Sequence, residues 1–243
     1  MRRFNMNNSA NVGIAATVVM VAIVGIILLA PSSSRSAMTQ PRCSPPATGV
    51  DVASVPTRLR ITERGVRFSL TVSSRNWGRF CSLNADKSPR GPISLNKSIM
   101  GSQGAEAIIY WTSFPNGDYA DPCTRLLGRS VGSSAADLAA AVSTAPGTEI
   151  VEKPSGVTLG GLPATHLVLK VRKSTGCDPG FFYGWKDVYG GALWTTTAPG
   201  NTIRVWIVSV DTTRLFIAAA TTEDANARLK RQVSQIVQSI RFA

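Results

Sequence analysis

The sequence TIRVWIVSV (Thr202–Val210), joined by DTTR to LFIAAA (Leu215–Ala220), predicts an antiparallel β-hairpin, because both runs are apolar and contain β-branched residues. Further along the chain, apolar residues recur at helical spacing, at Leu229, Val233, Ile236, Val237 and Ile240. A helix of this kind is stable when its apolar stripe lies on another apolar surface. We therefore expect the helix to pack on the sheet that contains the hairpin.

An uncharged apolar run near the N-terminus, Val12–Ala30, predicts a membrane segment. At about 1.5 Å per residue it makes a helix of roughly 28 Å, close to the hydrocarbon thickness of a bilayer. Arg2 and Arg3 precede the run, and positive residues stay on the cytoplasmic side. We expect residues 1–11 in the cytoplasm, residues 12–30 as a transmembrane signal-anchor, and the rest outside the cytoplasmic membrane.

A cleaved signal peptide is the alternative, and it would give a secreted protein. The apolar region of a signal peptide spans about 7–15 residues and leads to a cleavage site of small residues. Here the run is longer, Pro31 follows it directly, and Ser34-Arg35-Ser36 is a poor cleavage site. These features favour the uncleaved anchor.

Residues 31–56 predict a flexible stalk, because they are rich in proline and serine and have almost no large apolar side chain. The whole chain carries a net charge of +12, and only Arg2 and Arg3 of its basic residues precede the stalk. A basic surface attracts anionic lipid, acidic glycan or nucleic acid. The extracytoplasmic location and the lack of a recognised module argue against nucleic acid.

Residues 57–243 predict one folded α+β domain whose sheet is mainly antiparallel. Arg58–Glu63 and Val66–Ser73 alternate at period two around Arg64-Gly65, which predicts a first hairpin. Ser134 and Asp137 have the spacing that caps a short helix over Ser134–Val142. The remaining expected pieces are a turn-rich Cys81–Gly91, strands at Ile93–Ile99, Ala105–Phe114 and Ala164–Arg172, and short extended pieces on either side of Pro154-Ser155-Gly156.

Two motifs support a resemblance to a known fold. They are Gly160-Gly161-Leu162-Pro163-Ala164 in mid-chain and the closing helix that ends in IVQSIRF at Ile236–Phe242. With the Phe-containing strand Val66–Ser73, which leads to the turn Asn76-Trp77-Gly78, they resemble the Mog1/PsbP-like fold and, more closely, extracytoplasmic actinobacterial proteins of the LpqN-like lipoprotein group. The resemblance covers roughly residues 60–243 and implies an antiparallel sheet between helices, without shared catalytic residues. The chain departs from the lipoproteins because no cysteine directly follows its apolar run.

The chain has four cysteines, and outside the cytoplasm an even number indicates disulfides. Cys123 and Cys177 each lie beside Asp-Pro in a turn, so we predict that they pair. Cys43 and Cys81 would then join the stalk to the domain, although they can also be free or pair between molecules. No two cysteines have the close spacing of a zinc or redox site, and we expect neither a metal nor a cofactor.

A glycine-flanked aromatic segment is the most prominent candidate for a binding surface. It comprises Phe181, Phe182, Tyr183 and Trp185, because aromatic rings give contact area at low entropic cost. Lys170 and Arg172 are the basic residues that could accompany it on a neighbouring strand. The competing interpretation is that these aromatic residues cover the open end of the core.

The sequence favours a non-catalytic domain that binds a partner protein or an envelope ligand. It has no Gly-x-Ser-x-Gly elbow, and its only histidine, His166, alternates with basic residues on a strand. The alternative is an envelope hydrolase or transferase whose groups the fold brings together, such as Asp118 or Asp121 with Tyr183. A third hypothesis is an accessory domain whose positive charge binds anionic lipid.

Overall fold

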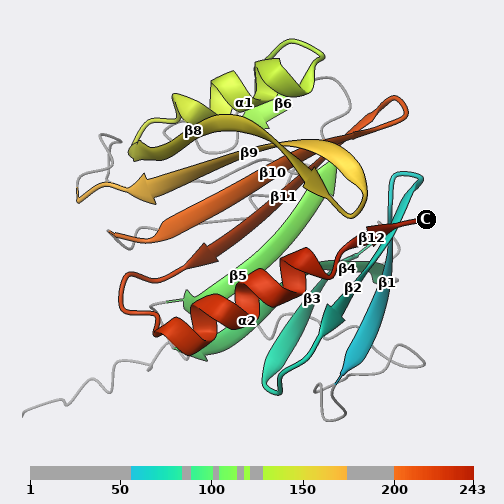
Figure 1. Ribbon diagram of the computed structural model, residues 1–243, viewed down its shortest axis with the longest axis vertical. Coiled ribbons are helices and arrows are strands. Elements are labelled where there is room, and N and C mark those ends of the chain that lie inside the picture. The colour runs from blue at the N-terminus through green and yellow to red at the C-terminus, as the bar shows by residue number, and fades with distance from the viewer. Residues whose placement is uncertain (1–55, 84–88, 101–103, 114–117, 121–127, 174–199) are drawn as a thin grey trace, which may run out of the picture. The chain divides into compact units, whose positions relative to one another are not determined.

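The computed structural model describes residues 56–83, 89–100, 104–113, 118–120, 128–173 and 200–243. Within these ranges the chain forms, in order, β1 (Thr57–Glu63), β2 (Val66–Val72), β3 (Trp77–Leu83), β4 (Pro89–Met100), β5 (Gly104–Ser113), β6 (Asp118–Ala120), β7 (Gly128–Ser130), α1 (Ala135–Ser143), β8 (Thr148–Leu159), β9 (Leu162–Val171), β10 (Thr202–Val210), β11 (Thr213–Thr221), α2 (Ala227–Gln238) and β12 (Arg241–Phe242). The predicted α+β class is confirmed (Figure 1).

A large sheet has the strand order β3-β4-β5-β11-β10-β9-β8, and every neighbouring pair in it is antiparallel. The predicted closing hairpin forms its centre, since β10 pairs with β11 from Thr202↔Thr221 to Val210↔Thr213. Asp211, in the connecting turn, has a φ of 51°, a left-handed conformation that aspartate tolerates better than most residues. The hairpin prediction is therefore confirmed.

A small sheet has the order β1-β2-β12 and joins segments that lie far apart in the chain. The first two strands form the predicted hairpin around Arg64-Gly65. The third strand pairs Arg241 with Ser69 and Phe242 with Phe68. The backbone N–H of Thr71 also donates a hydrogen bond to Ser239 Oγ at 2.7 Å, so the end of α2 is attached to β2 as well.

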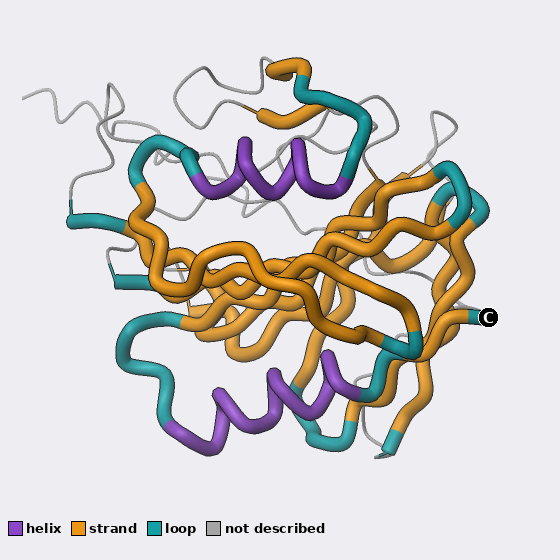
Figure 2. The backbone as a smooth tube through the Cα atoms, turned by 45° about the horizontal axis from the view of Figure 1, so that its top comes forward, coloured by secondary structure: helices purple, strands orange, loops and turns teal. Residues whose placement is uncertain are grey.

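Helix α2 covers one face of the large sheet (Figures 1 and 2). The apolar side chains between this helix and the two sheets form the first of two hydrophobic cores. The buried side chains of α2 are Leu229, Val233, Ile236 and Val237, four of the five residues that the spacing predicts. They share the core with β2 and β5, where the rings of Phe68 and Trp111 meet edge to face with centroids 5.8 Å apart. Burial of each of the four aliphatic side chains of α2 stabilises the folded state by about 1.5–3 kcal/mol. The predicted helix end is wrong, because α2 stops at Gln238, Ile240 enters the core after the helix, and Arg241–Phe242 form β12.

Helix α1 covers the opposite face of the large sheet, so the strands lie between two helices (Figure 2). Ser134 caps the helix and forms with Asp137 the reciprocal capping box that the sequence predicts. Leu138 and Val142 bury their side chains in a second core with residues of β9, β10 and β11.

Two predicted interruptions are wrong. The segment around Pro154 is one continuous strand, β8, because β8 is the edge of the sheet and only its β9 side must supply ladder hydrogen bonds. Its pairing register shifts twice, between Ile150 and Ser155, and these irregularities accommodate the proline. Likewise, the polar region Cys81–Gly91 contains the end of β3 and the start of β4 as well as residues outside the described ranges.

Several predictions fall outside the described residues. They include the membrane segment at 12–30, all of the predicted stalk except Pro56, and three of the cysteines, Cys43, Cys123 and Cys177. Cys81 belongs to β3, where its backbone is in register with Pro92, and the disulfide pairs stay predictions. Among the helices that the structure describes, none combines the length and hydropathy needed to span a membrane.

Candidate functional site

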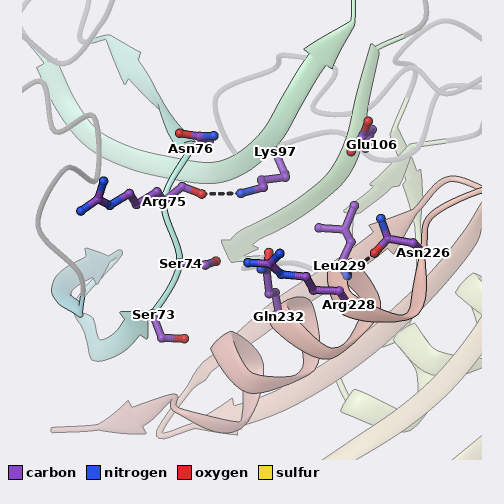
Figure 3. A pocket seen from close by; sticks show the side chains of 10 residues that line it. All are labelled: Ser73, Ser74, Arg75, Asn76, Lys97, Glu106, Asn226, Arg228, Leu229 and Gln232. Carbon is purple, nitrogen blue, oxygen red and sulfur yellow. Dashed lines mark hydrogen bonds between the residues drawn. The ribbon is translucent and has the colours of Figure 1, made fainter.

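A polar groove of about 510 Å³ lies where the turn between β2 and β3 meets the ends of β4 and β5 and the start of α2 (Figure 3). We call it the basic groove. Its lining residues are Ser73, Ser74, Arg75, Asn76, Lys97, Glu106, Asn226, Arg228, Leu229 and Gln232.

The turn on one side of the groove is held by local interactions. Asn76 has a φ of 65°, and asparagine is one of the few residues with a side chain that adopts this conformation readily. Trp77 follows it with a side chain only 1% exposed, and its indole N–H donates a hydrogen bond to Ser74 Oγ at 3.0 Å. The buried indole therefore anchors the turn that forms this wall.

The start of α2 forms the opposite wall. Asn226 caps the helix, because its Oδ1 accepts a hydrogen bond from the backbone N–H of Leu229 at 2.9 Å. The first turn of α2 has no acidic residue and instead carries the exposed Arg228. A cation is unfavourable at this end of a helix, where the backbone dipole already presents positive charge. This local departure from helix preference makes Arg228 a candidate functional residue.

Lys97 lies on β4, and its side chain extends into the groove. Its amino group donates a hydrogen bond to the carbonyl oxygen of Arg75 and lies 5.8 Å from the centre of the Trp77 ring. Burial lowers the pKa of Lys97, the positive charge of Arg228 lowers it further, and the carboxylate of Glu106 acts in the opposite direction. The positive charges of Lys97 and Arg228 therefore act on each other in the groove.

Figure 3 shows the side chains of Lys97 and Arg228 directed into the space between the turn and the helix, whereas the Arg75 side chain points away from it. Among the described residues, no carboxylate forms an ion pair with either Lys97 or Arg228. Two converging cations without a neutralising partner attract an anionic group and can hold it by charge-assisted hydrogen bonds.

The groove offers positive charge and hydrogen-bonding groups. Of its lining residues, only Leu229 is apolar, and that side chain is 4% exposed. Within the described ranges, no cluster of three or more His, Cys, Asp or Glu side chains is arranged to hold a metal ion. The arrangement can bind and orient an anion.

The predicted binding residues lie elsewhere. Lys170, on β9, forms an ion pair with Glu223 at 3.3 Å, and Arg172 is exposed just beyond the end of β9. The structure does not bring these two residues to the basic groove. Phe181, Phe182, Tyr183 and Trp185 lie outside the described residues, so the aromatic surface stays a prediction.

The hydrolase alternative also stays a prediction. Asp118 begins the short strand β6, where its backbone is in register with Ser130, while Asp121 and Tyr183 lie outside the described residues. His166 is half-buried and stacks on Trp206, with ring centroids 4.6 Å apart. Its Nδ1 lies 2.8 Å from the carbonyl oxygen of Val205, which orients the ring within the sheet.

Sequence reasoning missed the basic groove, because its residues come from four segments between residues 73 and 232. One local signal was present in the closing helix. Arg228 follows the Asn226 cap in a first turn without Asp or Glu, although acidic residues are preferred there.

Comparison with solved structures finds several chains with a similar backbone fold, among them the following two. One is LpqN of Mycobacterium tuberculosis, described as involved in cell envelope biogenesis, with a TM-score of 0.44 and 12% identity over 79% of this chain and 94% of LpqN. The other is the cyanobacterial PsbP of Synechocystis, with a TM-score of 0.40 and 11% identity over 82% of this chain and 99% of PsbP. These matches name the two groups that the sequence motifs resemble. No protein-family model matches the chain, and no curated protein matches it at a significant level.

Proposed function

We propose that the protein is a non-catalytic binding domain that captures an anionic ligand in the basic groove on the extracytoplasmic side of the membrane. One observation carries the proposal: Lys97 and Arg228 converge in a polar groove without an acidic ion-pair partner among the described residues. The location rests on the apolar run Val12–Ala30 and the arginines before it.

The repulsion between the two cations supports a binding role. Holding two like charges near each other in a partly desolvated site costs free energy in the empty protein, and an anion between them relieves it. The burial of Lys97 and the nearby charge of Arg228 are the two causes that lower the Lys97 pKa. A bound anion favours the protonated amine and so raises that pKa again.

Calorimetric titration of the full-length protein in an uncharged detergent tests the proposal. Inorganic phosphate and sulfate serve as probes, and the variants are Lys97→Met, Arg228→Gln and the double variant. We expect each single variant to lose about fivefold to tenfold in affinity, and wild-type binding to weaken as salt rises. Arg231→Gln is the matched control, because Arg231 is exposed on the same helix but does not line the groove.

Absence of saturable anion binding would contradict the proposal, as would equal affinities for wild type and the double variant. The location is tested separately by protease treatment of intact cells after removal of the outer layers of the envelope. A domain that is cleaved under these conditions lies outside the cytoplasmic membrane, and a protected one does not.

A further inference from the structure

We infer that the outer face of the small sheet docks on a membrane surface that contains anionic phospholipid. Four arginines on this face, Arg58, Arg60, Arg67 and Arg241, surround Ser69, and we call them the arginine face. None of these residues lines the basic groove. The inference therefore goes beyond the proposed function, since it concerns a different surface and a different mode of binding.

Strand alternation separates the two faces of the small sheet. The buried side chains of β1 and β2 point into the first core, and the residues between them point outward. Arg58, Arg60 and Arg67 are exposed members of the outward set. Arg241, on β12, is exposed and joins the same set because it is in register with Ser69 (Figure 1).

The register gathers the four arginines around Ser69. Arg60 is in register with Ser69 from one side and Arg241 from the other, so the two arginines are about 10 Å apart, or two strand spacings. Arg67 precedes Ser69 by two residues, about 7 Å along the same strand. The guanidinium of Arg58 donates hydrogen bonds to Ser69 Oγ from Nε at 3.2 Å and from Nη2 at 3.0 Å. The four charges therefore form a two-dimensional array.

The charge of this array is not neutralised within the described part of the protein. Glu63 carries the only acidic side chain of the three strands, and it is buried on the inner face, where Ser113 donates hydrogen bonds to it from N–H and Oγ. Neither ion pair found among the described residues involves the arginine face. Arg241 donates from Nη1 to the carbonyl oxygens of Gln238 and Ile240, and its other N–H groups remain for a ligand.

The chemistry of the arginine face matches a layer of phosphate groups. Guanidinium groups bind phosphate oxygens through paired hydrogen bonds, and an array on the open face of a sheet can contact several headgroups at once. Among the described residues, no aromatic side chain belongs to this face, which disfavours the stacking of nucleic-acid bases. Because large apolar side chains are missing from it as well, we expect contact with headgroups and no insertion below them.

The connection to the predicted anchor favours a membrane over a soluble polyanion. Strand β1 begins at Thr57, and only residues 31–56 separate it from the predicted membrane segment. Even fully extended, at about 3.5 Å per residue, this connection is shorter than about 100 Å. Such a tether keeps the sheet at a high effective concentration near the bilayer, so a contact that is weak in free solution becomes populated.

Sedimentation with liposomes tests this inference. The full-length protein is held in phosphatidylcholine nanodiscs, which accommodate its apolar segment, and is mixed with separate liposomes. The liposomes contain phosphatidylcholine alone or with about one third phosphatidylglycerol. We expect wild type to sediment only with the anionic liposomes, and less so as salt rises. In Arg60→Gln/Arg67→Gln, binding should fall about 25-fold, because each arginine near an anionic surface contributes about fivefold.

The matched control is Lys153→Gln/Lys173→Gln, which makes the same change in net charge at exposed positions outside the small sheet. The side chains of Arg60 and Arg67 are exposed and make no hydrogen bond to other described residues, so their replacement should leave the fold intact. Equal losses in the two double variants overturn the inference, as does equal binding of wild type to both kinds of liposome.

Alginate, an acidic polysaccharide, distinguishes a glycan from a membrane as the partner of the arginine face. If alginate binds wild type more tightly per negative charge than the anionic liposomes do, and Arg60→Gln/Arg67→Gln removes that binding, the face is a glycan surface and the membrane inference is wrong. Weaker binding of alginate supports the membrane. Phosphate binding by the basic groove is measured separately, so a failure of liposome binding leaves the proposed function standing.

Discussion

The guanidinium group of Arg214 holds the cap of helix α1, because its Nη1 lies 2.8 Å from the carbonyl oxygen of Ser134. The same atom lies 2.6 Å from the carbonyl oxygen of Gly132, and the Arg214 side chain comes from β11, at the centre of the large sheet. Burial lowers the pKa of Arg214, and the carboxylate of Asp137 opposes that effect. The arginine thus links the sheet to a helix start some 80 residues earlier in the chain.

Replacing Arg214 with alanine should lower the free energy of unfolding by about 2–4 kcal/mol, because two carbonyl oxygens lose charge-assisted hydrogen bonds in a site where the arginine is 5% exposed. Urea denaturation of the full-length protein measures the change. Arg231→Ala, on the exposed side of α2, should change the same quantity by less than about 0.5 kcal/mol. Equal effects of the two substitutions would show that the Arg214 hydrogen bonds do not contribute to the free energy of unfolding.

The capping box makes stability depend on acid. Hydrogen bonds from the Ser134 hydroxyl and backbone N–H lower the pKa of Asp137, and the charge of Arg214 lowers it further. Since the folded pKa lies below the unfolded one, the stabilisation is present above about pH 4 and is lost as the pH falls through the folded pKa. Asp137→Asn should therefore be less stable than wild type at neutral pH, with the difference shrinking in acid.

Denaturation of both proteins between neutral pH and pH 2 checks this expectation. Asp224→Asn serves as the control, because Asp224 is exposed and its side chain has no hydrogen bond among the described residues. A difference between wild type and Asp137→Asn that stays constant over the whole range would refute the role of the ionised cap.

Two adjacent glycines in the turn between β8 and β9 should differ sharply in their tolerance of alanine. Both have positive φ, 61° for Gly160 and 92° for Gly161, so each substitution carries backbone strain of about 1–2 kcal/mol. A Cβ on Gly160 would also lie 2.8 Å from Cδ2 of Phe242, whereas one on Gly161 meets nothing within 4 Å.

We expect Gly160→Ala to lower the free energy of unfolding by about 3 kcal/mol or more. Gly161→Ala should lower it only by the backbone strain of about 1–2 kcal/mol. Thermal denaturation of both variants provides the comparison. Removing the ring in Gly160→Ala/Phe242→Ala should make the double change less costly than the sum of its parts. Additive costs would mean that Phe242 does not crowd the turn.

Sulfate binding should weaken at alkaline pH in a way that reports on Lys97. The amine binds an anion in its protonated form. Because the pKa of Lys97 is lowered from the ordinary lysine value of about 10.4, the amine loses its proton at a lower pH than an exposed lysine does. Lys97→Arg should keep its affinity for sulfate at alkaline pH, because a guanidinium stays charged there. Lys173→Arg, exposed and outside the groove, should behave as wild type. Identical pH profiles for wild type and Lys97→Arg would exclude the amine from binding.

Local patterns predicted the elements whose apolar faces have a regular period. The hairpin Thr202–Ala220, the helix with Leu229 and Val233, and the cap at Ser134 belong to this kind. Pro154 was misleading because a proline breaks an inner strand but is tolerated at an edge, and edge position depends on topology. The strand order, with β11 between β5 and β10, cannot be predicted from the periodicity of apolar residues within each strand.

The basic groove could not be predicted in the same way. Lys97 alternates with other residues of a strand as an ordinary surface lysine would, and Arg228 looks like any basic residue on the polar side of a helix. Only the folding of β4 against β5, and the capping of α2 beside them, brings the two cations to one place. Function of this kind depends on tertiary contacts between ordinary residues.

The pairing of β12 with β2 has a consequence for biosynthesis. The ribosome releases the first hairpin long before it reaches Arg241 and Phe242, so the nascent chain holds β2 with one unsatisfied edge while more than a hundred further residues are made. Exposed strand edges invite pairing with other chains. The small sheet is therefore complete only after Arg241 and Phe242 have been made, and any factor that shields nascent β2 should raise the yield of native protein.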